Sequence, residues 1–176
     1  MAAPNLVLIG FMGTGKSTVG KLCAAQLGYR FYDSDSVIER RAGCSIPQLF
    51  AMQGEAAFRQ MEREVIRELA ETPGLVIATG GGAILDPENA ACLHARGRIV
   101  LLTAAPHIIL RRVGNARSRP LLAGAPDPRA RVEALLAERL PRYEAAAHHR
   151  MDTTDRSPQE IAAQIVAWYR LQEAAV

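Results

Sequence analysis

The sequence has little of what several large protein classes need. Aromatic residues are only 5% of the chain and the basic residues are not clustered, so a nucleic-acid surface is not expected. The three cysteines have no C-x-x-C spacing, which argues against a disulfide framework or a zinc site and favours a reducing compartment. The first ten residues contain an apolar run only at 6–9, too short for a signal sequence or a membrane span. We therefore expect a cytoplasmic protein that binds neither membranes nor nucleic acid.

The remaining composition is that of an ordinary folded protein. Hydrophobic residues make up 49% of the 176 residues and charged residues 22%, without a long run of like charge. This length fits one domain spanning 1–176, and we expect it to be a monomer. The formal net charge of +3 suits an anionic ligand.

Short apolar runs predict the strands. They lie at 6–9, 75–78 and 99–102, with 30–32 as a further candidate, and stretches with helical patterns separate them. Strands that alternate with helices predict an α/β fold of three layers, in which a central parallel sheet is flanked by helices. Right-handed crossovers would place the carboxyl ends of the strands, and any ligand crevice, at one edge.

Helix ends are signalled at two places. Residues 45–48 and 157–160 each have the pattern of a capping box with proline at the first helical position. Long amphipathic helices are expected over 54–71 and 128–147. The stretch 114–127 is rich in glycine and proline and lacks periodicity, so it predicts a mobile loop.

A phosphate-binding loop follows the first predicted strand. Residues 10–17 fit G-x-x-x-x-G-K-[ST], whose glycines let backbone N–H groups converge on phosphate oxygens. A helix expected over 17–27 would point its N-terminal dipole at the same phosphates. Lys16 is expected to reach the β and γ phosphates of ATP, and the Ser17 hydroxyl to bind Mg²⁺. The expected ATP-binding residues in this segment are Gly13, Thr14, Gly15, Lys16, Ser17 and Thr18.

The lysine of this loop is informative because lysine is rare in the chain. Lys16 and Lys21 are the two lysines among 21 basic residues, and the rest are arginines. A compact ammonium fits inside a ring of backbone amides, whereas a broad planar guanidinium does not. The residue type therefore supports the phosphate-binding interpretation.

An acidic pair follows the candidate strand at 30–32. If Asp33-Ser34-Asp35 is extended, its two carboxylates point the same way. One could support Mg²⁺ while the other accepts a proton from an attacking hydroxyl. The alternative is a capped turn that leads into a helix near 36–42. The phosphate-binding loop favours the first interpretation.

Further motifs follow in an order that resembles the shikimate kinase family. After the loop and the acidic pair come Phe58-Arg59, Gly80-Gly81-Gly82, Arg119-Pro120-Leu121-Leu122, and Arg139 with Tyr143. The resemblance extends from Leu6 to about Pro158 and lies in the joint order of the motifs. It implies a P-loop kinase fold that transfers a phosphoryl group from ATP to the 3-hydroxyl of shikimate. It also implies a helical substrate-binding region at about 34–60 and a lid at about 113–127.

The resemblance assigns roles around the substrate. It implies that Asp33 supports Mg²⁺ and that Asp35 contacts the substrate hydroxyls as the catalytic base. Arg59 and Arg139 would hold the substrate carboxylate, which agrees with the bidentate geometry of guanidinium groups. Glu62, nearly one turn after Arg59, is expected to hold that side chain, although Arg59 alone could equally lie on a solvated helix face. The implied substrate-binding residues are Asp35, Arg59, Gly81, Gly82 and Arg139, and the implied metal-binding residues are Ser17 and Asp33.

The resemblance also implies roles on the nucleotide side. Arg119, in the lid, would reach the transferring phosphoryl group and so complete the catalytic set with Lys16 and Asp35. Such an arginine would neutralise charge on the γ oxygens while the lid excludes water. Arg117 could compete for this role. Arg112 and Pro158 would sandwich the adenine.

Two other interpretations remain open. Another small P-loop kinase, such as a gluconate kinase or a nucleoside monophosphate kinase, would share the loop and the lid. A nucleotide-dependent switch without transferase activity would share the loop, but it would need no base such as Asp35. Asp35, Arg59, Gly81 and Arg139 together suit a polyhydroxylated carboxylate better than a nucleotide base.

Two further segments bear on where a metal ion could bind. The run at 75–79 ends in glycines rather than in an aspartate, so the Mg²⁺ ligands must come from Ser17 and Asp33. His148-His149 could suggest a metal, but adjacent histidines do not share one helix face. A solvated helix end is the interpretation that we prefer there.

Overall fold

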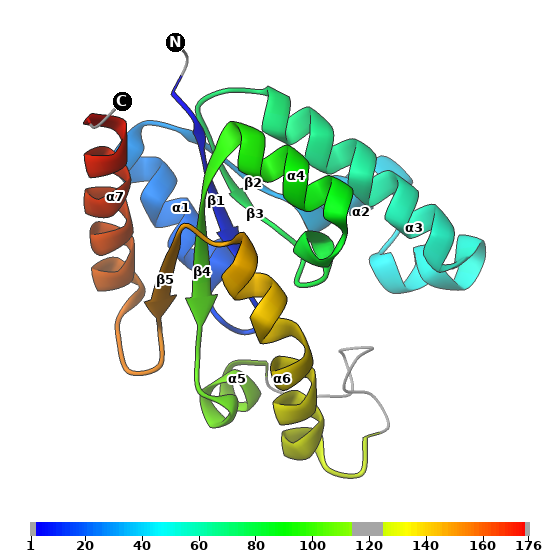
Figure 1. The fold of residues 1–176 in the computed structure, drawn as a ribbon. Helices are drawn as coiled ribbons and strands as arrows, with labels where there is room; N and C mark the ends of the chain where they lie inside the picture. Colours follow the sequence, from blue (N-terminus) through cyan, green and yellow to red (C-terminus); the bar gives the residue numbers. More distant parts are fainter. Residues whose placement is uncertain (1–2, 114–124, 175–176) are drawn as a thin grey trace.

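The computed structural model describes residues 3–113 and 125–174 and has a five-stranded parallel sheet at its centre (Figure 1). The strands, in the sheet order β2-β3-β1-β4-β5, are β2 Arg30–Asp33, β3 Leu75–Ala78, β1 Asn5–Ile9, β4 Gly97–Thr103 and β5 His149–Asp152. The helices are α1 Lys16–Leu27, α2 Ser34–Ala42, α3 Ile46–Glu71, α4 Pro87–Arg96, α5 Pro106–Val113, α6 Pro128–Ala146 and α7 Pro158–Ala174, with a short 3₁₀ helix η1 Ala83–Leu85. Within the described ranges, no helix is both long and apolar enough to cross a membrane.

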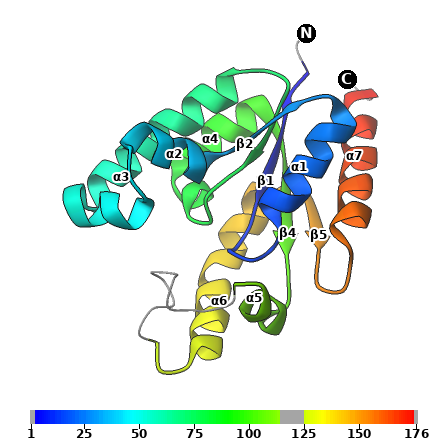
Figure 2. The same cartoon turned by 180° about the vertical axis from the view of Figure 1, so that it is seen from behind.

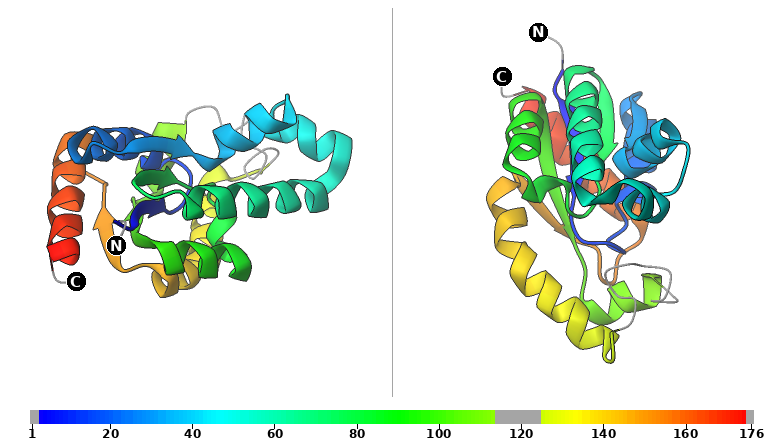
Figure 3. Two further views of the ribbon diagram at one scale, coloured as in Figure 1. Left: turned by 90° about the horizontal axis from the view of Figure 1, so that it is seen from above. Right: turned by 90° about the vertical axis from the view of Figure 1, so that its right-hand side faces the viewer.

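The two faces of the sheet have separate hydrophobic cores. Side chains alternate along β1, so that Val7 and Ile9 pack with α3, α4 and α6 on one face, while Leu6 and Leu8 pack with α1 and α7 on the other. Figures 2 and 3 show these helices on the two sides of the sheet. The predicted three-layer α/β fold is confirmed. Because both faces are covered, the central strands are apolar throughout, which explains why they could be recognised as runs.

The edge strand β5 was not predicted, and the helix end expected at His148-His149 was wrong. His149 begins β5, and its ring stacks on Trp168 with 4.9 Å between ring centroids. The Nδ1 atom of His148 accepts a hydrogen bond from the Ile99 N–H at 3.0 Å. Within β5 only Met151 is buried, so this strand lacks the apolar run that marks the central strands.

The helix α3 combines two predicted segments. Its N-cap is the predicted capping box of Ser45 and Gln48, and its backbone breaks at Gly54, where φ is 81° and ψ is 173°. The expected helix from 54 onward is therefore the longer arm of α3. Together, α2 and the shorter arm project past the β2 edge of the sheet (Figure 3). This arrangement puts the expected substrate-binding region, 34–60, on that side of the molecule.

Candidate active site

The predicted phosphate-binding loop connects β1 to α1. Gly10 has a φ of 139° and Gly15 a φ of 96°, which L side chains rarely adopt. A side chain at Gly10 would also lie 2.3 Å from the carbonyl oxygen of Leu102. The Lys16 ammonium donates hydrogen bonds to the carbonyl oxygens of Gly10 at 2.8 Å and Phe11 at 2.9 Å, so it lies across the loop. The loop thus has the backbone shape and the cation that phosphate binding needs.

The two expected metal-binding side chains are in contact. The Ser17 hydroxyl donates a hydrogen bond to Oδ2 of Asp33 at 2.6 Å. The other carboxylate oxygen accepts from the backbone N–H groups of Asp35 and Ser36 and so caps α2. The expected extended conformation was wrong because α2 begins at Ser34, and the capping alternative holds alongside the contact with Ser17. One hydroxyl and one carboxylate oxygen fit Mg²⁺, which proteins bind through few oxygen ligands together with phosphates and water.

The carboxyl group of Asp35 lies in a partly buried position. Burial, followed by the negative charges of Asp33 and Glu62, raises its pKa to about 6, while the positive charge of Lys16 acts in the opposite direction. A side chain at Gly80 would lie 2.5 Å from Oδ1 of Asp35. The carboxyl group therefore lies within electrostatic reach of Lys16 and packs against the turn after β3. A raised pKa is typical of a group that takes up a proton in catalysis.

The glycine triplet at 80–82 lies where several of these elements meet. The Gly80 N–H donates to the buried Ser34 hydroxyl at 3.0 Å, and the Gly81 carbonyl oxygen accepts from the Tyr143 hydroxyl at 2.6 Å. A side chain on the second glycine would lie 3.6 Å from the carbonyl oxygen of Gly10. A side chain at Gly82 would lie 3.3 Å from the guanidinium of Arg59. The triplet thus touches the phosphate-binding loop, α2, α3 and α6 together.

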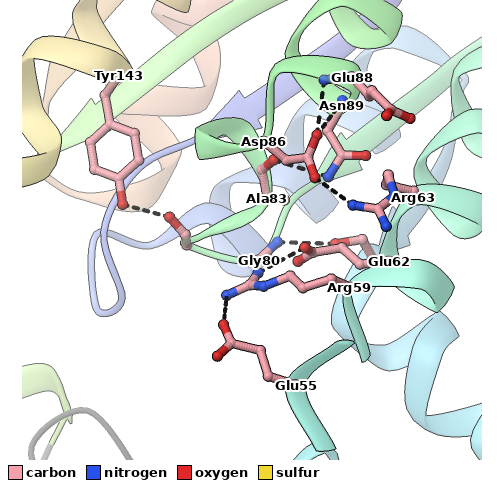
Figure 4. Close-up of polar contacts among 12 residues, drawn as sticks. Glu55, Arg59, Glu62, Arg63, Gly80, Ala83, Asp86, Glu88, Asn89 and Tyr143 are labelled. Carbon is pink, nitrogen blue, oxygen red and sulfur yellow. Dashed lines mark hydrogen bonds and ion pairs between the residues drawn. The ribbon is translucent and has the colours of Figure 1, made fainter. Parts of the chain in front are cut away.

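Arg59 is held by acidic side chains of its own helix (Figure 4). Its guanidinium donates to Glu62 at 2.8 Å and to Glu55 at 3.4 Å, and it lies 5.1 Å from the centroid of the Phe58 ring. Glu62 is 1% exposed, and burial raises its pKa although Arg59 opposes the shift. The expected pairing of Glu62 with Arg59 is confirmed. The pair and the ring hold the partly exposed Arg59 guanidinium beside the glycine triplet.

Arg139 reaches the site from α6. Its guanidinium carbon lies 5.8 Å from the centroid of the Phe11 ring, at the phosphate-binding loop. Within the described residues its buried Nε–H has no hydrogen-bond partner. Tyr143, one turn later, is 1% exposed, and burial raises the pKa of its hydroxyl. A buried donor without a protein acceptor fits an anionic ligand at this position.

The structure describes only some of the residues that are predicted to bind the nucleotide. Arg112, on α5, donates to the carbonyl oxygen of Gly13 at 3.3 Å, and it also contacts Thr153. Pro158 is exposed at the first position of α7, five residues after Thr153. The structure therefore brings Arg112 to the phosphate-binding loop, whereas no contact joins it to Pro158. Outside the described residues lie Arg117, Arg119 and the rest of 114–124.

Three contacts of the site follow from no local sequence pattern. Ser34 lies between two aspartates and Tyr143 belongs to a motif, but neither pattern predicts a partner for the hydroxyl. Thr153 carried no local signal at all. A further ion pair, between Arg63 and Asp86 at 2.9 Å, joins α3 to α4 beside the Arg59 pair (Figure 4).

Known proteins resemble this chain over almost its full length. A family profile described as shikimate kinase matches residues 12–170. The shikimate kinase of Geobacter sulfurreducens is 47% identical over 166 residues, which cover 94% of this chain and 91% of that protein. This chain belongs to the shikimate kinase family. It is accordingly an enzyme that uses ATP and Mg²⁺ to phosphorylate shikimate.

Solved structures agree with this assignment. The shikimate kinase of Acinetobacter baumannii, in complex with shikimate, superposes with a TM-score of 0.91 at 38% identity and covers 97% of this chain and 95% of that chain. A gluconokinase from Sinorhizobium meliloti superposes with a TM-score of 0.63 at 20% identity, covering 98% of this chain and 95% of that chain. The second likeness is one of fold alone. The comparisons therefore favour shikimate over the gluconate alternative.

Proposed function

We propose that this chain phosphorylates the 3-hydroxyl of shikimate with Asp35 as the base and with Arg59 and Arg139 holding the carboxylate. One observation carries the proposal: the glycine triplet at 80–82 packs against Asp35, Arg59 and the phosphate-binding loop at once. A substrate seated on the triplet would have a base, a guanidinium and a phosphate-binding loop around it. Such an arrangement would allow an acceptor hydroxyl to lie in line with a bound γ-phosphoryl group.

On the nucleotide side, the backbone N–H groups of residues 13–18 would bind the phosphates of ATP. Lys16 would exchange its two loop carbonyls for β and γ phosphate oxygens. Ser17 and Asp33 would hold Mg²⁺, which when bound neutralises charge on those oxygens. The proposal also includes Arg112 and Pro158 at the adenine, and Arg119, from a lid at about 113–127, at the γ-phosphoryl group.

On the acceptor side, Asp35 would accept the proton of the attacking hydroxyl. Its position beside Lys16 and the triplet supports this role, since a base must lie within hydrogen-bond reach of the proton that it removes. Arg59, already oriented by buried Glu62, would bind the carboxylate together with Arg139. The N–H groups of Gly81 and Gly82 would contribute further hydrogen bonds. Each of these groups lies at the carboxyl ends of parallel strands or on the helices next to them.

An ADP-release assay tests the proposal. Shikimate, gluconate, a nucleoside monophosphate and no acceptor are compared at equal ATP, and the phosphorylated position is identified by nuclear magnetic resonance. We expect ADP release with shikimate alone and phosphate on its 3-hydroxyl. In Asp35→Asn, turnover should fall by about 10³-fold while ADP still binds. Equal ADP release without an acceptor, or full activity of the Asn variant, would refute the proposed roles.

We further infer that residues 1–176 form one domain, with the acceptor region at about 34–60, that acts as a cytoplasmic monomer. Among the described residues, the exposed large hydrophobic side chains are Met52 and Leu171, on different helices, so they form no joint patch for a second copy. The cytoplasmic location is supported by the need of the reaction for ATP. Light scattering after size-exclusion chromatography should give the mass of one chain, and the mass of a dimer would refute the monomer.

A further inference from the structure

A buried hydroxyl connects three distant segments beside the phosphate-binding loop. Thr153, directly after β5, is 3% exposed. Its Oγ1 lies 3.1 Å from the carbonyl oxygen of Thr14 and 3.0 Å from that of Thr103, and it accepts a hydrogen bond from the Arg112 guanidinium at 2.9 Å. A hydroxyl has one proton and two acceptor lone pairs, so the proton is shared between the two carbonyls while a lone pair takes the arginine. A valine at this position, which has no donor or acceptor, could make none of these bonds.

The same region brings α5 against the loop. Arg112 also donates to the carbonyl oxygen of Thr153 at 2.6 Å and to that of Gly13 at 3.3 Å. A side chain on Gly13 would lie 3.0 Å from Val113 and 3.3 Å from the carbonyl oxygen of Ile109, so α5 packs closely on the loop. The guanidinium of Arg112 is thus held between the loop and the segment after β5.

From this geometry we infer that Thr153 is a positioning residue for the nucleotide. Its hydroxyl orients the guanidinium of Arg112 and fixes the turn at Gly13 and Thr14 relative to β4. It touches no reacting atom. The inference rests on the proposed place of Arg112 in the nucleotide site, and it adds the group that sets the orientation of that arginine.

Thr153 orients Arg112 before the nucleotide binds. Arginine has many rotamers, and ordering such a side chain on binding lowers affinity. Two hydrogen bonds to Thr153 order Arg112 before the nucleotide arrives. Without the hydroxyl, one bond to the arginine is lost, and the buried Thr14 carbonyl loses a hydrogen-bond partner. Nucleotide affinity should fall, whereas the acceptor side should not change.

Steady-state kinetics of Thr153→Val and Thr153→Ser test the inference. Valine keeps the shape and removes the hydroxyl, whereas serine keeps the hydroxyl. We expect the valine variant to raise KM for ATP about 10-fold, with KM for shikimate and kcat within about threefold of wild type. The serine variant should lie within about twofold of wild type in both KM values. Thr72→Val is the matched control, because its hydroxyl also donates to a main-chain carbonyl, that of Glu68, on α3.

An Arg112→Met variant separates this inference from the proposal on which it rests. If Arg112→Met leaves KM for ATP unchanged, the proposed place of Arg112 is wrong. If Arg112→Met raises KM for ATP and Thr153→Val does not, the inference about Thr153 alone is overturned. It is also overturned if both KM values rise equally, or if serine fails to restore the KM for ATP. Should the valine variant not fold, Thr153→Ala against Thr153→Ser makes the same comparison, since the two differ by the hydroxyl.

Discussion

In the proposed nucleotide half, the phosphate-binding loop at residues 10–18 is one continuous segment, whereas the proposed acceptor half takes Asp35, Arg59 and Arg139 from three different helices. In this loop, backbone N–H groups would make most of the phosphate contacts, and glycine conformations set the shape of the loop. In the acceptor half the active groups are charged side chains, and buried partners such as Glu62 hold them. Phosphate binding should therefore depend on the shape of the loop and of the side chain inside it. Acceptor binding should depend on how each charged side chain is oriented. Charge-conserving substitutions in the two halves should therefore both fail, each for its own reason.

The largest effect is expected from Lys16→Arg. The ammonium lies 2.8 Å and 2.9 Å from two loop carbonyls, and a planar guanidinium does not fit that space. We expect kcat/KM for ATP to fall by about 10³-fold although the charge is kept. Lys21→Arg, at the other lysine of the chain and exposed on α1, is the control and should have wild-type kinetics. An active Lys16→Arg variant would show that charge suffices in the nucleotide half.

The reverse substitution, Arg59→Lys, addresses the acceptor half. The Arg59 guanidinium bonds to Glu62 through one nitrogen and has further N–H groups for a substrate carboxylate, a planar geometry that lysine cannot reproduce. We expect kcat/KM for shikimate to fall by about 100-fold, with KM for ATP unchanged. Arg41→Lys is the control, since Arg41 also pairs with a glutamate, Glu68, but in an exposed position. Equal losses in the two variants would contradict a specific role of Arg59.

A smaller effect is expected from Tyr143→Phe. The substitution removes the hydroxyl that donates to the carbonyl oxygen of Gly81 at 2.6 Å. We expect KM for shikimate to rise about fivefold and KM for ATP to stay the same, because the hydrogen bond orients the acceptor side alone. In Tyr169→Phe, where a buried hydroxyl bonds to the Pro4 carbonyl on the other face of the sheet, neither KM should change. A change in KM for ATP in Tyr143→Phe would weaken the division into halves.

The smallest effect concerns stability. The pKa of Asp35 in the folded protein is about 6, above its ordinary value, so the folded state binds this proton more tightly than the unfolded state. The wild-type protein should therefore gain stability as pH falls from above 6 toward 4. In metal-free buffer at pH 8, Asp35→Asn should raise Tm by about 5 °C, because it removes a partly buried charge worth about 1–3 kcal/mol. The difference should vanish near pH 4 in thermal unfolding followed by circular dichroism, and a lower Tm of the variant at pH 8 would contradict the burial argument.

The phosphate-binding loop and the central sheet could be predicted because both depend on local pattern. The apolar runs that became β1, β3 and β4 are buried on both faces, and the loop is a contiguous motif. Strand β5 was missed because an edge strand keeps polar residues. The capping boxes and the pairing of Arg59 with Glu62 were predicted because they follow helical spacing.

The remaining contacts could not be predicted because they join segments that only the fold brings together. The bond from Tyr143 to the triplet spans 62 residues, and that from Thr153 to Thr14 spans 139. Neither residue lies in a local pattern that names its partner. The roles of the acceptor residues came from the family resemblance, and the structure adds the supports that orient them, which are Ser34, Glu62 and Tyr143.

A pair of calorimetric titrations tests the division of the site most directly. Mg-ADP and shikimate are each titrated into Lys16→Arg and Arg59→Lys. The division predicts that the first variant loses Mg-ADP binding and keeps the wild-type Kd for shikimate within about threefold, and that the second does the opposite. Loss of both ligands in both variants, with folding intact, would contradict the account.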